Sequence, residues 1–287
     1  MPEGPEVENV RQELLQLVSK QVEQIRLTPL SQKYPKYQDK QALFTQFNEK
    51  VLTEIVRFGK FLVWRFKDIN AVILNHLGMT GRWCFFSDIK NLPASAKHVK
   101  IIIQMYTPPS AIFDDTRNFG QFRVFESFET VVNYPPIRQL GIDGLTSPFP
   151  LEEFLTRLEK KNFENQPVGE VLLNQRLVAG VGNIYKTESL FHAKINPNRI
   201  VRTLSDTERE ELGLAIGEIL QKALLDKGST LNFQPYELPS GERGNAQSWH
   251  KVYNREGKPC LICENPIRRS VQKGRSTFYC SQCQKKS

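Results

Sequence analysis

Four cysteines near the end of the chain have the spacing of metal ligands. Cys260, Cys263, Cys280 and Cys283 form two C-x2-C pairs with sixteen residues between them. Each pair can present two thiolates to one tetrahedral ion, and four thiolates leave no open position for a reacting water. The pattern therefore predicts one structural zinc ion in a short hairpin and no catalytic cofactor. A redox or catalytic metal is the alternative.

The stretch between the two cysteine pairs is basic and contains few apolar residues. It is too poor in apolar side chains to build a core, so the zinc ion should provide the local fold. Cations on such a hairpin suit the phosphates of a nucleic acid, whereas a solvated hairpin or a protein contact is the alternative. The basic residues in and after this stretch are Arg268, Arg269, Lys273, Arg275, Lys285 and Lys286.

The whole chain carries an excess of positive charge. Its 287 residues include 39 Lys and Arg against 31 Asp and Glu, a formal net charge of +8. Such a charge favours a polyanionic partner, and a basic protein without one is the alternative. No run of residues resembles a membrane span or a signal peptide, so we expect an intracellular protein with no membrane partner. Cys84, within an apolar run, is expected to be buried.

The N-terminus combines an imino acid with carboxylates. Residues Pro2-Glu3-Gly4-Pro5-Glu6 precede apolar residues at helical spacing, so a helix begins within a few residues of the end. Proline at a helix start and glutamate in a first turn are ordinary capping choices. On local sequence alone, that structural interpretation is favoured over a chemical role.

The elements that would position these residues change character along the chain. Residues 20–130 are predicted to form an antiparallel β-sandwich or barrel with the N-terminal helix on its flank. Residues 131–150 are rich in proline and glycine, and we interpret them as a linker. The apolar runs that predict strands are Val51–Phe58, Phe61–Phe66, Ala71–Leu74, Val99–Tyr106 and Gln121–Phe128.

The second half of the chain is predicted to be helical. Ser205 with Glu208 forms a capping box before the last and longest helix. Residues 228–250 are expected to form a long polar loop before the zinc hairpin. The predicted helices are Leu151–Leu158, Val168–Leu173, Asn183–Phe191 and Thr207–Leu225. The predicted domains are 1–132, a linker over 133–150, a helical domain over 151–250 and a zinc finger over 251–287.

Six further motifs follow one another over essentially the whole chain. They are Pro2-Glu3-Gly4-Pro5-Glu6-Val7, Gly59-Lys60, His76-Leu77-Gly78-Met79-Thr80-Gly81-Arg82, Arg117-Asn118-Phe119-Gly120, Gly180-Val181-Gly182-Asn183-Ile184-Tyr185 with Glu188, and the zinc segment with Gly274-Arg275-Ser276-Thr277. In this order they resemble the motifs of the formamidopyrimidine-DNA glycosylase / endonuclease VIII family. The resemblance implies an α+β fold, with an N-terminal β-sandwich and a C-terminal domain that carries a helix-two-turn-helix motif and a zinc finger. It also implies damaged DNA as the partner.

The resemblance assigns catalytic roles at the N-terminus. Once Met1 is removed, Pro2 carries a secondary amine, and an α-amino group is partly unprotonated near neutral pH. The implied activity is that of a DNA glycosylase and abasic-site lyase, which forms a Schiff base on Pro2 and cleaves the strand by β,δ-elimination. Glu3 is implied as the acid-base residue, with Glu6 as an auxiliary carboxylate and Lys60 as a lysine that assists at the lesion. A solvated hairpin lysine is the alternative for Lys60.

The resemblance also implies contacts with DNA. His76, Asn183 and Arg275 match residues that contact phosphates. Met79, Arg117 and Phe119 match the residues that fill the gap left by an extruded base. Core packing is the alternative for Met79 and Phe119.

The features that bear on the choice of lesion point to both sides of the family. Gly4 is typical of the endonuclease VIII side, whereas His76-Leu77-Gly78-Met79 and Arg117-Asn118-Phe119-Gly120 resemble the formamidopyrimidine side. Asn118 stands where that side often has arginine, and residues 231–249 lack the aromatic-glutamine pattern associated with an oxidised purine. We therefore expect an endonuclease VIII-like member, acting as a monomer on oxidised pyrimidines and ring-opened purines rather than on 8-oxoguanine. The rival interpretations are a non-catalytic protein that binds damaged DNA and a zinc-ribbon interaction protein whose charge is incidental.

Overall fold

The structure is a computed structural model that describes residues 2–32, 41–94, 96–231 and 236–285. These residues form two compact units, and neither unit is a continuous stretch of chain. Met1, Lys286 and residues 232–235 of the predicted polar loop lie outside the described residues. Pro2, Glu6–Arg138 and Lys227–Asn245 belong to the first unit, and Glu3–Pro5, Gln139–Asp226 and Ala246–Ser287 belong to the second.

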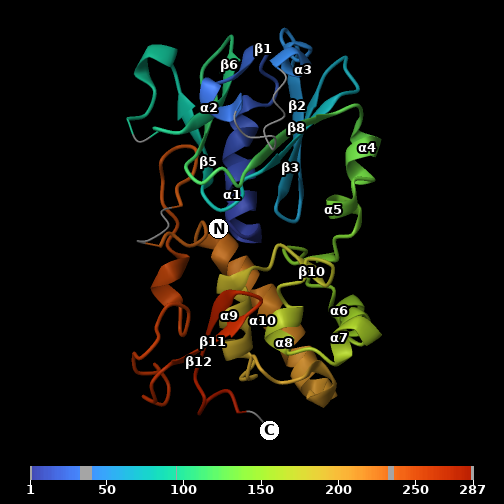
Figure 1. The fold of residues 1–287 in the computed structure, drawn as a ribbon, viewed down its shortest axis with the longest axis vertical. Coiled ribbons are helices and arrows are strands. Elements are labelled where there is room, and N and C mark those ends of the chain that lie inside the picture. Colours follow the sequence, from blue (N-terminus) through green and yellow to red (C-terminus); the bar gives the residue numbers. More distant parts are fainter. Residues whose placement is uncertain (1, 33–40, 95, 232–235, 286–287) are drawn as a thin grey trace. The chain divides into compact units, whose positions relative to one another are not determined.

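The first unit contains two four-stranded antiparallel sheets, which confirms the predicted β-sandwich (Figure 1). One sheet has the order β1 (Val22–Leu27), β6 (Val99–Met105), β7 (Ser110–Asp115) and β5 (Gly81–Phe86). The other has the order β2 (Leu52–Phe58), β3 (Phe61–Phe66), β4 (Val72–His76) and β8 (Gln121–Phe125).

The sandwich core is rich in aromatic side chains. Trp83 contacts Trp64 and Phe113 with ring centroids 5.0 and 5.1 Å apart, and its indole nitrogen donates to Asn75 at 3.0 Å. The N-terminal helix α1 (Gly4–Leu14) and the 3-10 turn η1 (Leu15–Leu17) add buried residues at the predicted helical spacing. The shorter helical elements are α2 (Pro29–Gln32), α3 (Gln41–Thr45), η3 (Ile89–Asn91), α4 (Phe128–Val132) and α5 (Pro135–Arg138).

The second unit is mainly helical. The predicted capping box is present, with Ser205 Oγ accepting from the Glu208 N–H and Glu208 accepting from the Ser205 N–H. The helical elements are α6 (Leu151–Leu158), α7 (Lys161–Glu164), α8 (Val168–Val171), α9 (Asn183–His192), η4 (Val201–Thr203), α10 (Asp206–Leu225) and η5 (Ala246–Trp249). The strands are the parallel pair β9 (Ile142–Asp143) and β10 (Val178–Ala179), and the hairpin β11 (Arg268–Gln272) and β12 (Arg275–Tyr279).

Several predicted elements need correction. Strands β1, β5 and β7 were not predicted. Buried residues occupy the first, fourth and sixth positions of β1 and every position of β7, so neither strand shows a regular alternation of buried and exposed residues. The strand predicted to reach Phe128 ends at Phe125, since the Ser127 hydroxyl caps α4. Helix α7 was also missed. No helix formed by the described residues is long and apolar enough to cross a membrane.

Candidate active site and zinc centre

The predicted site residues are divided between the two units. The first unit contains Pro2, Glu6, Lys60, His76, Met79, Arg117 and Phe119, and the second contains Glu3, Asn183, Arg275 and the four cysteines.

Glu6 is fixed by the segment that follows α10 in the chain. Its Oε1 accepts from the Ser229 N–H at 2.8 Å, and its main-chain oxygen accepts from the Tyr236 hydroxyl at 3.1 Å. A side chain at Gly228 would lie 2.7 Å from the Glu6 carboxylate, so glycine is required there. Pro2, in the same unit, is also buried.

Lys60 lies in the tight turn between β2 and β3. Its neighbour Gly59 has a φ of 56°, a conformation that glycine adopts without strain, and the Gly59 oxygen accepts from Arg57 Nη1 at 3.0 Å. Lys60 is only 7% exposed. This burial excludes the alternative of a merely solvated hairpin lysine, because burying a lysine carries a large desolvation cost.

His76 ends strand β4, directly opposite Phe61 in the register of β3. The two rings are in contact, with centroids 4.7 Å apart. The Nδ1 atom of His76 accepts from the Gly78 N–H at 2.9 Å, which fixes the ring orientation.

The proposed gap-filling residues lie on two loops of the first unit. Phe119 is 42% exposed, and the Arg117 guanidinium lies over its ring at 5.1 Å from the centroid. Core packing is therefore excluded for Phe119. Met79 is half-buried, and Arg117 is exposed.

Glu3 is held by three backbone donors. It is 2% exposed, and it accepts from the N–H groups of Gly182 at 2.9 Å, Ile184 at 2.8 Å and Tyr185 at 3.2 Å. These donors belong to the N-terminal turn of α9, where helix N–H groups otherwise lack partners. A Cβ at Gly182 would lie 2.3 Å from the Glu3 carboxyl carbon. Glu3 thus caps α9.

Asn183 opens α9 and bonds to the zinc hairpin. Its Nδ2 donates to the Ser276 oxygen at 2.7 Å, and its Oδ1 accepts from Lys186 Nζ at 3.0 Å. Lys186 Nζ also donates to Thr277 Oγ1 at 2.7 Å. A phosphate at Asn183 would therefore have to share or replace an existing partner.

Lys186 is fully buried within this network. Burial, which outweighs the nearby Glu3 carboxylate, lowers the pKa of Lys186 to about 7, and the Arg275 charge adds to the lowering. Burial likewise raises the pKa of the neighbouring Tyr253 to about 12. The network joins α9 to β12 through one ammonium group.

Glu188, further along α9, fixes the start of the zinc segment. Its carboxylate accepts from the N–H groups of Lys251 at 2.8 Å, Val252 at 3.1 Å and Tyr253 at 2.8 Å. Burial nevertheless raises the pKa of Glu188 above its ordinary value. The residue belongs to a motif that the sequence singled out, but its structural partners could not be predicted.

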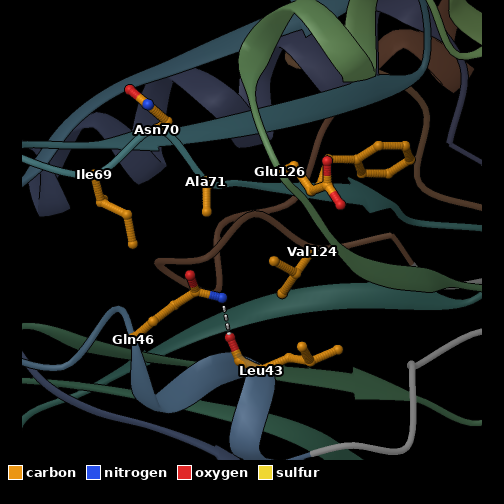
Figure 2. A pocket seen from close by; sticks show the side chains of 8 residues that line it. Leu43, Gln46, Ile69, Asn70, Ala71, Val124 and Glu126 are labelled. Carbon is orange, nitrogen blue, oxygen red and sulfur yellow. Dashed lines mark hydrogen bonds between the residues drawn. The ribbon is translucent and has the colours of Figure 1, made fainter.

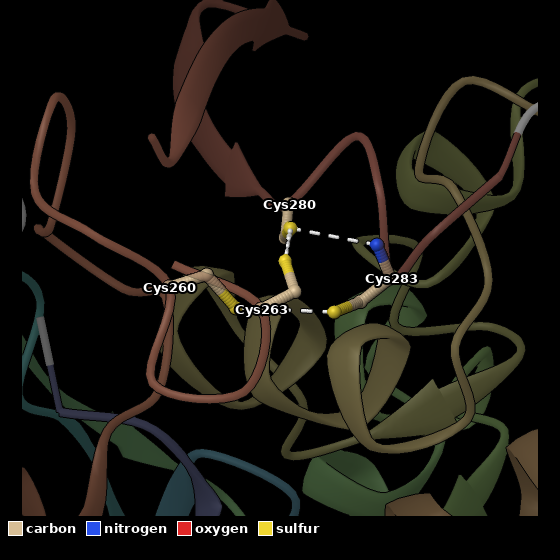
Figure 3. A group of neighbouring side chains, drawn as sticks. All are labelled: Cys260, Cys263, Cys280 and Cys283. Carbon is tan, nitrogen blue, oxygen red and sulfur yellow. Dashed lines mark hydrogen bonds between the residues drawn. The ribbon is translucent and has the colours of Figure 1, made fainter. Parts of the chain in front are cut away.

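The four cysteines gather at one place, as predicted (Figure 3). Their sulfur atoms all lie within 4.8 Å of one another, with Cys260 and Cys283 3.9 Å apart and Cys263 and Cys280 3.4 Å apart. A zinc ion bound at the usual length would place tetrahedral sulfurs roughly 3.8 Å apart. The donor set therefore fits a structural zinc ion.

The zinc hairpin ends in a tight turn. Lys273 and Gly274 both have positive φ, of 46° and 71°, the combination that a two-residue hairpin turn favours. Arg275 follows this turn and is exposed. Cys84, the fifth cysteine, is buried as predicted, and burial raises the pKa of its thiol to about 11.

Two cavities are lined by residues other than the proposed catalytic and DNA-binding residues. One, of about 490 Å³, opens between α3, β8 and the residues before β4, and is lined in part by Leu43, Gln46 and Val124 (Figure 2). The other, of about 430 Å³, lies in the second unit beside Phe191, Trp249 and Cys283. Neither cavity contains a residue proposed to act on DNA.

The structure adds residues to which the sequence assigned no role. Thr80 and Asp115 bond the two gap-filling loops to each other, and Lys186 and Tyr253 surround Asn183. All of these contacts join residues distant in the sequence, except that between Asn183 and Lys186. Residues 184–191 of α9 are all buried, so no polar stripe marked Lys186 as unusual.

Family models match three parts of the chain. They are the formamidopyrimidine-DNA glycosylase N-terminal domain over residues 1–122, the formamidopyrimidine-DNA glycosylase H2TH domain over residues 140–234, and the zinc finger found in FPG and IleRS over residues 257–286. The last match, with the cysteine geometry, supports a structural zinc ion.

Full-length relatives agree with these matches. This chain is 35% identical to the formamidopyrimidine-DNA glycosylase of Wolbachia sp. subsp. Brugia malayi. The match covers 99% of this chain and 100% of the relative. The crystal structure of the MutM (Fpg) protein from Thermus thermophilus is 34% identical, with a TM-score of 0.84 and full coverage of both chains.

A third protein has been solved with damaged DNA. The Lactococcus lactis Fpg in complex with abasic-site DNA is 30% identical, with a TM-score of 0.85, covering 99% of this chain and 100% of its own. Other structures of that protein contain an oxidised pyrimidine or Fapy-dG. The expected fold and family are confirmed, whereas the endonuclease VIII-like placement stays a prediction. The chain is a member of the formamidopyrimidine-DNA glycosylase family.

Proposed function

We propose that this chain is a base-excision DNA repair enzyme, a bifunctional DNA glycosylase and abasic-site lyase. The observation that carries the proposal is the anchored Glu3 carboxylate, which directly follows Pro2 in a chain that matches the family over almost its whole length. A buried carboxylate with three backbone donors is held in one position, as a proton carrier in catalysis must be. A member of this family acts on genomic DNA, so we expect it to work inside the cell. We also expect it to act as a monomer.

The chemistry follows from the Pro2 amine. Its nitrogen lone pair attacks C1′ of the damaged nucleotide, the bond to the base breaks, the base leaves with a proton, and the amine gives up its own proton. The bond between C1′ and O4′ then breaks, O4′ takes a proton, and the nitrogen lone pair forms a double bond to C1′. The resulting iminium acidifies the C2′ protons, so β-elimination and then δ-elimination release the flanking phosphates. Water finally hydrolyses the iminium and regenerates the amine.

The other candidate residues take supporting roles. Glu3 moves protons to and from the opening sugar, with Glu6 as an auxiliary carboxylate and Lys60 as a cation for the lesion or its phosphate. Arg275 and His76 are proposed to hold phosphates, as is Asn183 by exchanging one of its present partners. Met79, Arg117 and Phe119 fill the space of the extruded nucleotide.

For the preferred lesion, we propose oxidised pyrimidines and ring-opened purines ahead of 8-oxoguanine. The crystallised relative with an oxidised pyrimidine and with Fapy-dG supports both classes as candidates. Single-lesion duplexes of each type, compared by single-turnover excision, test the order. Faster excision of 8-oxoguanine than of both other classes would contradict it.

Borohydride trapping tests the covalent mechanism. Reduction during reaction with abasic-site DNA should give a stable adduct, and peptide mass analysis should place it on the α-nitrogen of Pro2. A variant with one extra residue before Pro2 lacks the free amine and should give no adduct while it still binds DNA. Tight binding with no adduct in the natural chain would support the alternative, a non-catalytic damaged-DNA-binding protein.

A further inference from the structure

The two loops that carry the proposed gap-filling residues touch backbone to backbone. Met79 lies in the loop after β4, and Arg117 and Phe119 lie between β7 and β8. Gly78 has a φ of 66°, and a Cβ there would lie 2.4 Å from the Phe119 carbonyl carbon and 2.5 Å from the Gly120 nitrogen. No larger residue fits, so the two loops meet as one packed surface.

A buried carboxylate and a hydroxyl join the same two loops. Asp115, the last residue of β7, is fully buried. Its Oδ1 accepts from Thr80 Oγ1 at 2.7 Å, and its Oδ2 accepts from the Gly120 N–H at 2.8 Å. Thr80 Oγ1 in turn accepts from the Arg117 N–H at 3.0 Å.

These bonds place one fixed point beside each gap-filling residue. Thr80 follows Met79, the bonded N–H belongs to Arg117 itself, and Gly120 follows Phe119. Asn118, between the last two, has a φ of 58°, which is uncommon for a residue other than glycine. The backbone is therefore held on both sides of a strained position while the Phe119 ring stays exposed.

We infer that Thr80 and Asp115 are positioning residues, which hold Met79, Arg117 and Phe119 as one preformed wedge for the base gap. The inference rests on the gap-filling role proposed above. Extruding a base costs a few kcal/mol of stacking, and a wedge that had to be ordered on binding would add a conformational cost to this. The hydrogen bonds of Thr80 and Asp115 are already formed before DNA binds, so they remove that second cost.

The threonine hydroxyl offers a sharp test. Thr80→Val keeps the side-chain shape and removes the hydroxyl, whereas Thr80→Ser keeps the hydroxyl. On a lesion in duplex DNA, we expect Thr80→Val to lose roughly tenfold or more in single-turnover excision, and Thr80→Ser to stay close to the natural chain. On a single-stranded abasic oligonucleotide, which has no partner base to displace, both variants should cleave at the natural rate.

A positioning role and a general structural role give different results. Equal loss on both substrates would overturn the inference, and so would an unchanged duplex rate. If Thr80→Val does not fold, Asp115→Ala provides the same comparison, because it removes both oxygens that accept from the Thr80 hydroxyl and the Gly120 N–H. Unchanged duplex excision by Asp115→Ala, or equal loss on both substrates, would likewise overturn the inference.

A companion variant separates this inference from the proposed function. Phe119→Ala should lose duplex excision if the wedge fills the gap, and should change the fluorescence of 2-aminopurine placed opposite the lesion. If Phe119→Ala behaves as the natural chain does, the gap-filling role itself fails. If Phe119→Ala loses duplex excision and Thr80→Val does not, only the positioning role of Thr80 and Asp115 is disproved.

Discussion

The Glu3 carboxylate caps a helix and is also the proposed acid-base residue, and the local sequence could not distinguish these two roles. In the sequence, a glutamate beside a helix start is best explained as a cap for that helix. In the structure it accepts from the N–H groups of Gly182, Ile184 and Tyr185, about 180 positions along the chain. The resemblance to a family supplied its chemical role, but neither the resemblance nor the local pattern could supply this contact. The burial of Lys60 was equally invisible, because burial depends on the tertiary fold.

Glu3→Gln tests the chemical role of the residue. We expect DNA affinity to change little, while single-turnover base excision falls roughly a hundredfold or more, because an amide cannot carry the proton. Glu13→Gln, the same change on α1 outside the candidate site, is the matched control and should keep full activity. Excision at the natural rate by Glu3→Gln would remove this residue from its assigned role.

Among the helices and strands, the sequence predicted those whose start and end are marked by nearby residues. The capping box of α10 and the ends of α6 were evident because their signals lie within a few residues. Strand β7 was not evident, since its polar residues Asp114 and Asp115 are buried through hydrogen bonds with other parts of the chain. The junction of α9 and β12 through Lys186 was hidden for the same reason.

Lys186 should make stability depend on pH. Its pKa is about 7 in the folded protein and near 10.5 when unfolded, so between these values the unfolded chain binds the extra proton. The free energy of unfolding should therefore rise as pH rises, by about 2 kcal/mol between pH 7 and 9. Urea unfolding of the zinc-loaded protein should show this rise, and Lys186→Met should lack it.

The control for this measurement is an exposed lysine. Lys161→Met, in α7, should keep the pH dependence of the natural chain. Parallel curves for the natural chain and Lys186→Met would mean that the buried ammonium keeps its proton throughout this range.

At the scale of the whole molecule, charge was easier to predict than the division into units. The net charge of +8 follows from composition. Composition does not show that Lys227–Asn245 belongs with the first unit. This assignment depends on tertiary contacts, such as the hydrogen bond from the Phe85 N–H to the Pro239 oxygen at 2.9 Å. The sequence had grouped this segment with the helical half, and the predicted domain boundaries stay predictions.

The charge predicts salt-dependent DNA binding. The logarithm of the affinity for undamaged duplex should fall linearly with the logarithm of the salt concentration, because bound phosphates release counterions. Arg275→Ala should reduce this slope by about one. Arg157→Ala, whose guanidinium pairs with Glu153 on α6, is the control and should leave the slope unchanged. An affinity for DNA that does not change with the salt concentration would instead favour a zinc-ribbon interaction protein whose charge is incidental.

The interleaved path of the chain limits how the protein can be divided. A fragment that stops at Arg138 would lack residues 227–245, so the Glu6 carboxylate would lose the Ser229 N–H and the buried side chains of Tyr236 and Leu238 would be missing from the core. A gene fragment for the sandwich therefore needs this later segment grafted back through a designed connection. Protease nicks in exposed loops should likewise leave the pieces associated until a denaturant is added.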